Sequence, residues 1–172
     1  MAHKEQIDFC TSIKHQFPEY FKEKNVLDVG SLDINGNNRY LFKNCQYTGL
    51  DLGQGQNVDI ICPIHEYCPG FQYDFIVSTE MLEHDKFLPL SLMRMFNLVK
   101  AGGAILITCA TGCREEHGTV NSQPQTSPFT NDYYRNVTVS DIEFYLPKNR
   151  FSEYLIETSL VDLYFFSIKS GQ

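Results

Sequence analysis

The chain has 172 residues, of which 42% are hydrophobic, and its formal net charge at pH 7 is −7. A chain of this length buries roughly 70% of its unfolded surface, so we expect a single domain over residues 1–172 with no room for a second core. The acidic balance argues against nucleic acid as a partner, because phosphate binding draws most of its strength from Lys and Arg.

The first residues do not have the charged region and apolar core of a signal peptide, and no stretch approaches 18 consecutive apolar residues. We therefore expect a cytoplasmic protein without a membrane segment. The sequence does not indicate an oligomeric state.

The six cysteines contain no C-x-x-C pair. In a reducing compartment they are expected to be free thiols that pack as small hydrophobic side chains. An alternative is a zinc site, because Cys113 and His117 are four residues apart and could share a helical face with Cys109 nearby. The six are Cys10, Cys45, Cys62, Cys68, Cys109 and Cys113.

The N-terminal segment, residues 1–24, is expected to be mainly a helix. Ile7, Cys10, Ile13 and Phe17 are spaced three or four residues apart over residues 3–16, and Pro18 follows as a stop. An amphipathic helix of this kind would cover one face of a sheet.

Residues 25–51 predict the half-unit of a nucleoside-binding α/β fold. An apolar strand over 25–30 ends at Gly30, which permits a tight turn, and a second strand over 46–50 ends at Asp51. Asp51 comes 21 residues after Gly30 in the sequence. Such folds place a carboxylate that binds ribose hydroxyls at about this sequence separation. The ligand is therefore expected to be a nucleoside derivative.

The turn after the first strand is acidic and lacks the G-x-G-x-x-G pattern that brings backbone amides to a pyrophosphate. Asp28 and Asp33 flank it, and Asp51, Asp59 and Glu80 follow at later strand ends. Such an edge repels a dinucleotide and suits a cation, such as the ammonium and sulfonium of S-adenosyl-L-methionine.

Further strands are expected at 58–61, 73–78 and 103–109, with a helix over about 86–99 that Gly102 and Gly103 would stop. This alternation predicts an α/β fold with a doubly wound parallel sheet. Residues 110–137 form a long polar loop, a candidate substrate lid. A helix capped by Thr138 or Ser140 follows and ends before Pro147, and residues 151–157 and 161–168 predict a hairpin.

Four segments in order resemble the successive motifs of class I S-adenosylmethionine-dependent methyltransferases. They are Val26–Gly30, Gly49–Asp51, Tyr73–His84 and Leu98–Thr108. The resemblance implies a mostly parallel seven-stranded sheet with a C-terminal antiparallel strand and helices on both faces. It implies S-adenosyl-L-methionine as cofactor, S-adenosyl-L-homocysteine as product, and in-line methyl transfer.

The resemblance also suggests the cofactor site. Gly30 and Ser31 would lie by the methionine portion and Asp51 by the ribose. The family's acid after the third strand is absent here, which leaves backbone groups near Cys62 and Ile64 for the adenine. The expected cofactor-binding residues are Asp28, Gly30, Ser31, Asp51, Leu52, Cys62, Ile64, Ser78, Thr79 and Glu80.

The acceptor is expected to be a small molecule or a glycan with an oxygen or nitrogen nucleophile. His84, which Glu80 could orient from one helical turn away, is the first candidate for a general base, and His117 is the second. For each, a purely structural role is the alternative. Tyr133, Tyr134 and Arg135 could line an acceptor pocket or pack the loop.

Two other functions remain open from the sequence. One is a non-catalytic S-adenosylmethionine-binding regulator or subunit, which the altered glycine loop Ser31–Asn35 favours. The other is a nicotinamide oxidoreductase, which the acidic turn opposes.

Overall fold

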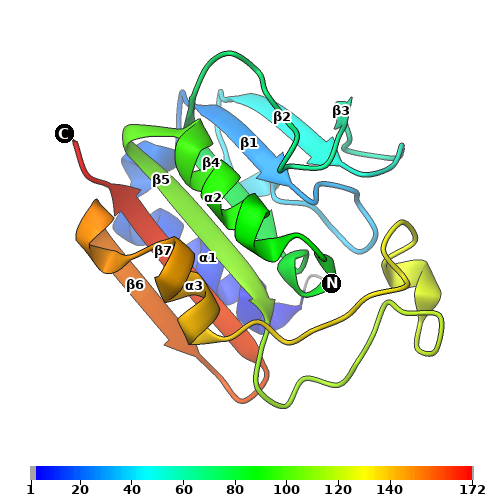
Figure 1. The fold of residues 1–172 in the computed structure, drawn as a ribbon. Helices are drawn as coiled ribbons and strands as arrows, with labels where there is room; N and C mark the ends of the chain where they lie inside the picture. Colours follow the sequence, from blue (N-terminus) through cyan, green and yellow to red (C-terminus); the bar gives the residue numbers. More distant parts are fainter. Residues whose placement is uncertain (1–2, 172) are drawn as a thin grey trace.

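A seven-stranded sheet organises the chain, which a computed structural model describes over residues 3–171 (Figure 1). The ends of the expected 1–172 domain, residues 1–2 and 172, lie outside the described residues. The strand order is β3-β2-β1-β4-β5-β7-β6, and β7 runs antiparallel to both of its neighbours. The strands are β1 (Asn25–Val29), β2 (Gln46–Asp51), β3 (Ile60–Ile61), β4 (Tyr73–Thr79), β5 (Val99–Ala110), β6 (Phe151–Thr158) and β7 (Asp162–Lys169).

The parallel strands β1, β2 and β4 end at the same edge of the sheet. Val29 pairs with Leu50, and Asp28 pairs with both Gly49 and Val77. This register brings the residues that follow each strand together, as expected for ligand sites outside the carboxyl ends of parallel strands.

The helices divide between the two faces of the sheet (Figure 1). Helix α1 (Lys4–Gln16) buries Phe9, Cys10 and Ile13 against one face, whose apolar side chains include Phe75 and Phe166. Helices α2 (Leu88–Leu98) and α3 (Val139–Tyr145) cover the other face. The described helices include none that is long and apolar enough to cross a membrane.

The predicted fold class is confirmed, including the antiparallel last strand beside β5 and the hairpin that it forms with β6. Thr138 is the cap of α3, and it forms a reciprocal capping box with Asp141. The prediction that Gly102 and Gly103 stop the second helix was wrong. That helix ends at Leu98, because Val99 is already extended and pairs with Tyr73 of β4.

The connection between β1 and β2 contains one 3₁₀ turn, Arg39–Leu41, and no α-helix. Strand β3 is shorter than the predicted 58–61 and pairs through only two residues. The β1–β2–β3 side of the sheet is therefore formed mainly by strands and loops.

Candidate functional site

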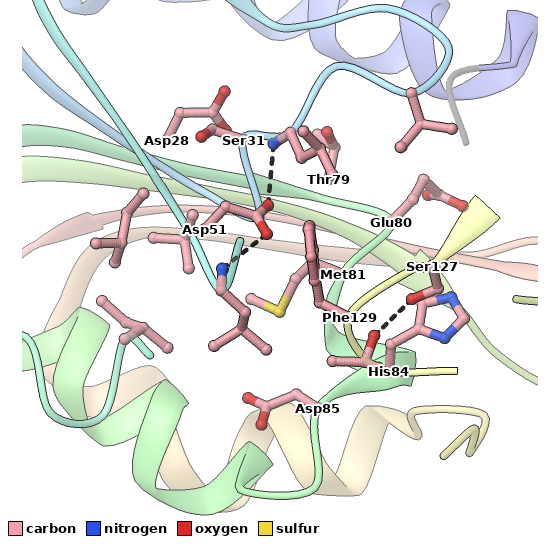
Figure 2. A pocket seen from close by; sticks show the side chains of 18 of the residues that line it. Asp28, Ser31, Asp51, Thr79, Glu80, Met81, His84, Asp85, Ser127 and Phe129 are labelled. Atoms are coloured by element: carbon pink, nitrogen blue, oxygen red, sulfur yellow. Dashed lines mark hydrogen bonds between the residues drawn. The ribbon is translucent and has the colours of Figure 1, made fainter. Parts of the chain in front are cut away.

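A cavity of about 720 Å³ opens at the carboxyl edge of β1, β2 and β4 (Figure 2). Nine of the ten predicted cofactor residues line this cavity, and Ser78 is the exception. The nine are Asp28, Gly30, Ser31, Asp51, Leu52, Cys62, Ile64, Thr79 and Glu80.

The turn after β1 is held tightly by the neighbouring strand. The backbone N–H groups of Gly30 and Ser31 both donate to the carbonyl of Leu50, at 2.9 and 3.1 Å. Gly30 adopts φ +80°, and a Cβ at this position would lie 2.5 Å from Cγ of Met81. Glycine is therefore required here both for the backbone angle and for space.

Asp51 faces the cavity from the end of β2. Its Oδ2 accepts from the backbone N–H of Leu32 at 2.9 Å, and its Oδ1 accepts from that of Leu52 at 2.7 Å. Burial raises the pKa of Asp51, and the backbone donors oppose that shift. Because a carboxylate has about four lone-pair sites, Asp51 can still accept hydrogen bonds from a ligand.

Asp28 lies at the floor of the cavity with only 1% of its surface exposed. It accepts from Nδ2 of Asn38 at 3.2 Å and from the hydroxyl of Tyr47. Burial raises the pKa of Asp28 to about 6 despite these donors. The Asn38 amide also donates to Oγ1 of Thr79 at 3.0 Å, which ties β1 to β4 beneath the site.

Glu80 follows β4 with its backbone in the left-handed region, at φ 54°. Such a conformation is uncommon for a residue with a side chain and is concentrated at functional sites. Its Oε1 accepts from Oγ1 of Thr108 at 2.9 Å, and Oε2 lies 3.7 Å from Nη2 of Arg114. Glu80 thus adds a third carboxylate to the edge (Figure 2).

The segment expected to contact adenine, residues 62–64, already forms contacts within the fold. The Cys62 backbone N–H donates to the carbonyl of Asp51 at 2.9 Å, and the Ile64 side chain is buried in the core. Pro63 and His65 also line the cavity here. Adenine contacts with this segment remain a prediction.

Ser78 points away from the cavity. Its hydroxyl donates to the carbonyl of Val29 at 2.9 Å within the sheet, and 1% of the residue is exposed. Successive side chains of a strand point to opposite faces, which explains why its neighbour Thr79 lines the cavity instead.

Of the two candidate bases, His84 lines the cavity and His117 does not. The two imidazole rings meet edge-on at 5.2 Å, and Tyr134 packs against both, 5.5 Å from His84 and 5.0 Å from His117. Burial lowers the pKa of His84 to about 4 and also lowers the pKa of His117.

The three predicted acceptor residues also lie off this cavity. Tyr133 and Tyr134 line a smaller hollow, and Nη2 of Arg135 pairs with Oδ1 of Asp141 at 3.3 Å. The geometry therefore favours the packing alternative for Tyr134 and Arg135.

The long loop contributes cavity residues that the sequence did not single out. Thr126–Thr130 lines the cavity, and Figure 2 shows Ser127 and Phe129 of this segment. The ring of Phe129 lies next to Gly53. A Cβ on Gly53 would come within 2.1 Å of that ring. The available signal was an aromatic residue directly after Pro128 in a polar loop.

The cysteine-containing zinc site receives no support from the part of the chain described. Two clusters there could hold a metal ion, and neither contains Cys109 or Cys113. Cys109 is buried in β5, where burial raises the pKa of its thiol well above the ordinary value.

No protein-family model and no curated protein sequence matches the chain. Solved structures do share its fold. The 1,6-didemethyltoxoflavin-N1-methyltransferase of Burkholderia thailandensis, with S-adenosylhomocysteine bound, aligns with a TM-score of 0.65 and 16% identity over 96% of this chain and 79% of its own. N-methyltransferase NodS of Bradyrhizobium japonicum WM9, also with S-adenosylhomocysteine bound, aligns with a TM-score of 0.64 and 11% identity. That alignment covers 97% of this chain and 88% of NodS.

Phosphoethanolamine N-methyltransferase 2 of Haemonchus contortus, bound to phosphomonomethylethanolamine and S-adenosylhomocysteine, aligns with a TM-score of 0.67 and 18% identity over 95% of this chain. This chain spans 53% of the length of that protein. The fold is thus that of class I S-adenosylmethionine-dependent methyltransferases.

Proposed function

We propose that this protein is an S-adenosylmethionine-dependent methyltransferase that acts on a small-molecule or sugar-type oxygen or nitrogen nucleophile. The observation that carries the proposal is that the Gly30–Ser31 turn and the Asp51 carboxylate face one cavity. A volume of about 720 Å³ lies within the usual range for small-ligand sites. The small-molecule N-methyltransferases that share the fold support this choice of acceptor.

In this proposal the acidic edge selects a cationic cofactor. Asp51 accepts hydrogen bonds from the ribose hydroxyls of S-adenosylmethionine, and the Gly30–Ser31 turn lies next to the methionine portion of this cofactor. Asp28 and Glu80 place negative charge near the ammonium and sulfonium groups. Because the cofactor supplies the reactive methyl group, the protein contributes mainly orientation and exclusion of water.

We do not propose His84 alone as the general base that removes a proton from the acceptor. A pKa of about 4 keeps the imidazole neutral at pH 7, but makes it a weak base. Acceptors that attack as neutral amines need no base before methyl transfer, whereas hydroxyl acceptors need another means of activation.

The loop segment Thr126–Thr130 is proposed as the lid of the site. Phe129 is 49% exposed although its ring lies over Gly53 beside Asp51. A ligand in the cavity would bury more of this ring and so favour the closed loop.

Thermal unfolding with S-adenosylmethionine, S-adenosylhomocysteine and NADH in separate titrations tests the proposal. A ligand at about 100 times its dissociation constant adds roughly 2.7 kcal/mol, which should raise the midpoint by about 5–10 °C. We expect this shift with the two adenosyl ligands and none with NADH. No shift with either adenosyl ligand would overturn the proposal.

Asp51→Asn is the matched site variant and Asp59→Asn its control. Asp59 also lies near β2 and accepts from the backbone N–H of Gly49, but it does not line the cavity. Hydrogen bonds to a charged group contribute about 1.5–3 kcal/mol, so Asp51→Asn should weaken S-adenosylmethionine binding about 10- to 150-fold. Equal affinities in the two variants would exclude Asp51 from the site.

The non-catalytic alternative has one observation in its favour, since the altered turn after β1 is not followed by an α-helix. Cofactor binding without methyl transfer to amine, hydroxyl or sugar acceptors would favour a regulator or subunit over an enzyme.

A further inference from the structure

Three side chains able to bind a metal converge beside the cavity: Glu83, His84 and His117. One carboxylate oxygen and one ring nitrogen from each histidine lie within 4.8 Å of one another. Glu83 and His84 come from the 3₁₀ turn η3 (Leu82–His84) after β4, and His117 comes from the long loop. The cluster therefore joins two segments that are distant in sequence.

Four polar atoms of this cluster are buried and have no hydrogen-bond partner within residues 3–171. They are both carboxylate oxygens of Glu83, Nδ1 of His84 and Nε2 of His117. Glu83 has no exposed surface, and His84 is 6% exposed. Oε1 of Glu83 and Nε2 of His117 are 3.9 Å apart, too far for a hydrogen bond. Buried polar groups are normally satisfied, so these four orphaned atoms need an explanation.

The hydrogen bonding of His117 leaves its Nε2 nitrogen available to bind a metal ion. Its Nδ1 lies 3.1 Å from the carbonyl oxygen of Glu115. Because a carbonyl only accepts, Nδ1 carries the proton and Nε2 presents its lone pair toward Glu83. Metal-bound histidines characteristically donate their second nitrogen to a backbone carbonyl or carboxylate in this way. The His84 imidazole likewise interacts with the backbone of Tyr133 while its Nδ1 has no partner.

The charges around the cluster favour a cation. Glu80 lies close enough to Glu83 for the charges of their two carboxyl groups to interact, so it adds a second acidic group beside the cluster. Arg114 is the opposing positive charge, and its guanidinium is already paired with Glu80 and Asp162.

We propose that Glu83, His84 and His117 bind a divalent transition-metal ion such as Zn²⁺. Two imidazole nitrogens and one carboxylate oxygen suit Zn²⁺, Co²⁺, Fe²⁺ or Mn²⁺ better than Mg²⁺ or Ca²⁺, which prefer oxygen ligands. The ion would fasten the long loop to the turn after β4. Three protein ligands leave a position for solvent or for an acceptor hydroxyl, whose pKa the metal would lower. This last step rests on the proposed function.

The second cluster, His3, Glu80 and Asp162, carries no such proposal. Asp162 already accepts from Nε2 of His3 at 3.1 Å, from Nη1 of Arg114 at 2.5 Å and from the Tyr164 hydroxyl at 3.1 Å. A carboxylate bonded in this way is satisfied without an ion.

The test is titration of the metal-free protein, residues 1–172, with Zn²⁺ by calorimetry and with Co²⁺ by visible absorption, both without S-adenosylmethionine. We expect one ion per chain for the wild type. Glu83→Gln and His117→Ala should each weaken binding about tenfold or more. His65→Ala, which removes a cavity histidine outside the cluster, and His3→Ala should bind as the wild type does.

Wild-type protein that binds neither ion, or the two cluster variants binding as tightly as the wild type, would overturn the proposal. So would Co²⁺-thiolate charge-transfer absorption together with loss of binding in Cys113→Ser, which would assign the ion to cysteine. Circular dichroism establishes that each variant is folded, and Glu83→Gln keeps the shape of the buried side chain. Metal binding without a thermal shift by S-adenosylmethionine would refute the proposed function alone, and the reverse result would refute only the metal site.

Discussion

Asp28→Asn should change how the stability of the protein depends on pH. Asp28 is buried, and its pKa is raised from the ordinary 3.8 to about 6 in the folded protein. Between these two values the folded state holds a proton that the unfolded state has released. The resulting stabilisation is fully present below pH 3.8 and is lost as the pH rises through 6.

The size of this effect follows from proton linkage. Between pH 4 and pH 8 the wild type should lose about 2 kcal/mol of unfolding free energy that Asp28→Asn does not lose. The other titrating groups are the same in both proteins, so they cancel when the two unfolding free energies are subtracted at each pH. A constant penalty from the changed hydrogen bonds to Asn38 and Tyr47 shifts this difference without changing its slope.

Urea unfolding of both proteins at half-unit pH intervals from 4 to 8 measures the difference. Asp59→Asn, which removes a half-exposed carboxylate, controls for the change in net charge. A wild-type-minus-variant free energy that is constant, or that increases with pH, would refute the assignment of a raised pKa to a buried Asp28.

Three further predictions concern local packing. Gly30→Ala should lower the unfolding free energy in urea by about 2 kcal/mol or more, because of the positive φ and the contact with Met81. Gly53→Ala should displace the Phe129 ring and weaken S-adenosylmethionine binding measured by calorimetry, yet have no added effect in Phe129→Ala protein. Thr138→Ala should cost about 1 kcal/mol in the same urea assay by removing the capping box of α3, and an unchanged midpoint would contradict that role.

Local patterns predicted the sheet and the edge where the cavity lies. Apolar runs marked β1, β2 and β4, and the carboxyl ends of parallel strands must meet, so Gly30, Asp51 and Glu80 could be placed together without coordinates. Strict alternation along β4 could also have removed Ser78 from the predicted site.

Long-range contacts could not be predicted in this way. The polar loop has no periodicity, so nothing local indicated that Phe129 reaches Gly53 or that His117 reaches Glu83. The end of α2 depended on pairing between Val99 and Tyr73, which overrode the glycines that seemed to mark it. Each of these features depends on how distant segments pack.

The insertion of β7 between β5 and β6 has a consequence for folding. β5 is buried along most of its length, and one of its two edges pairs with β7, where Ala110 lies opposite Asp162. In the chain, β7 comes only after the long loop, α3 and β6. Until that distant segment docks, an apolar strand presents free backbone groups to any other chain nearby. Because β7 pairs with β5 late, refolding should be slow. It should also be sensitive to protein concentration, because strand pairing between chains competes with the pairing of β7 and β5.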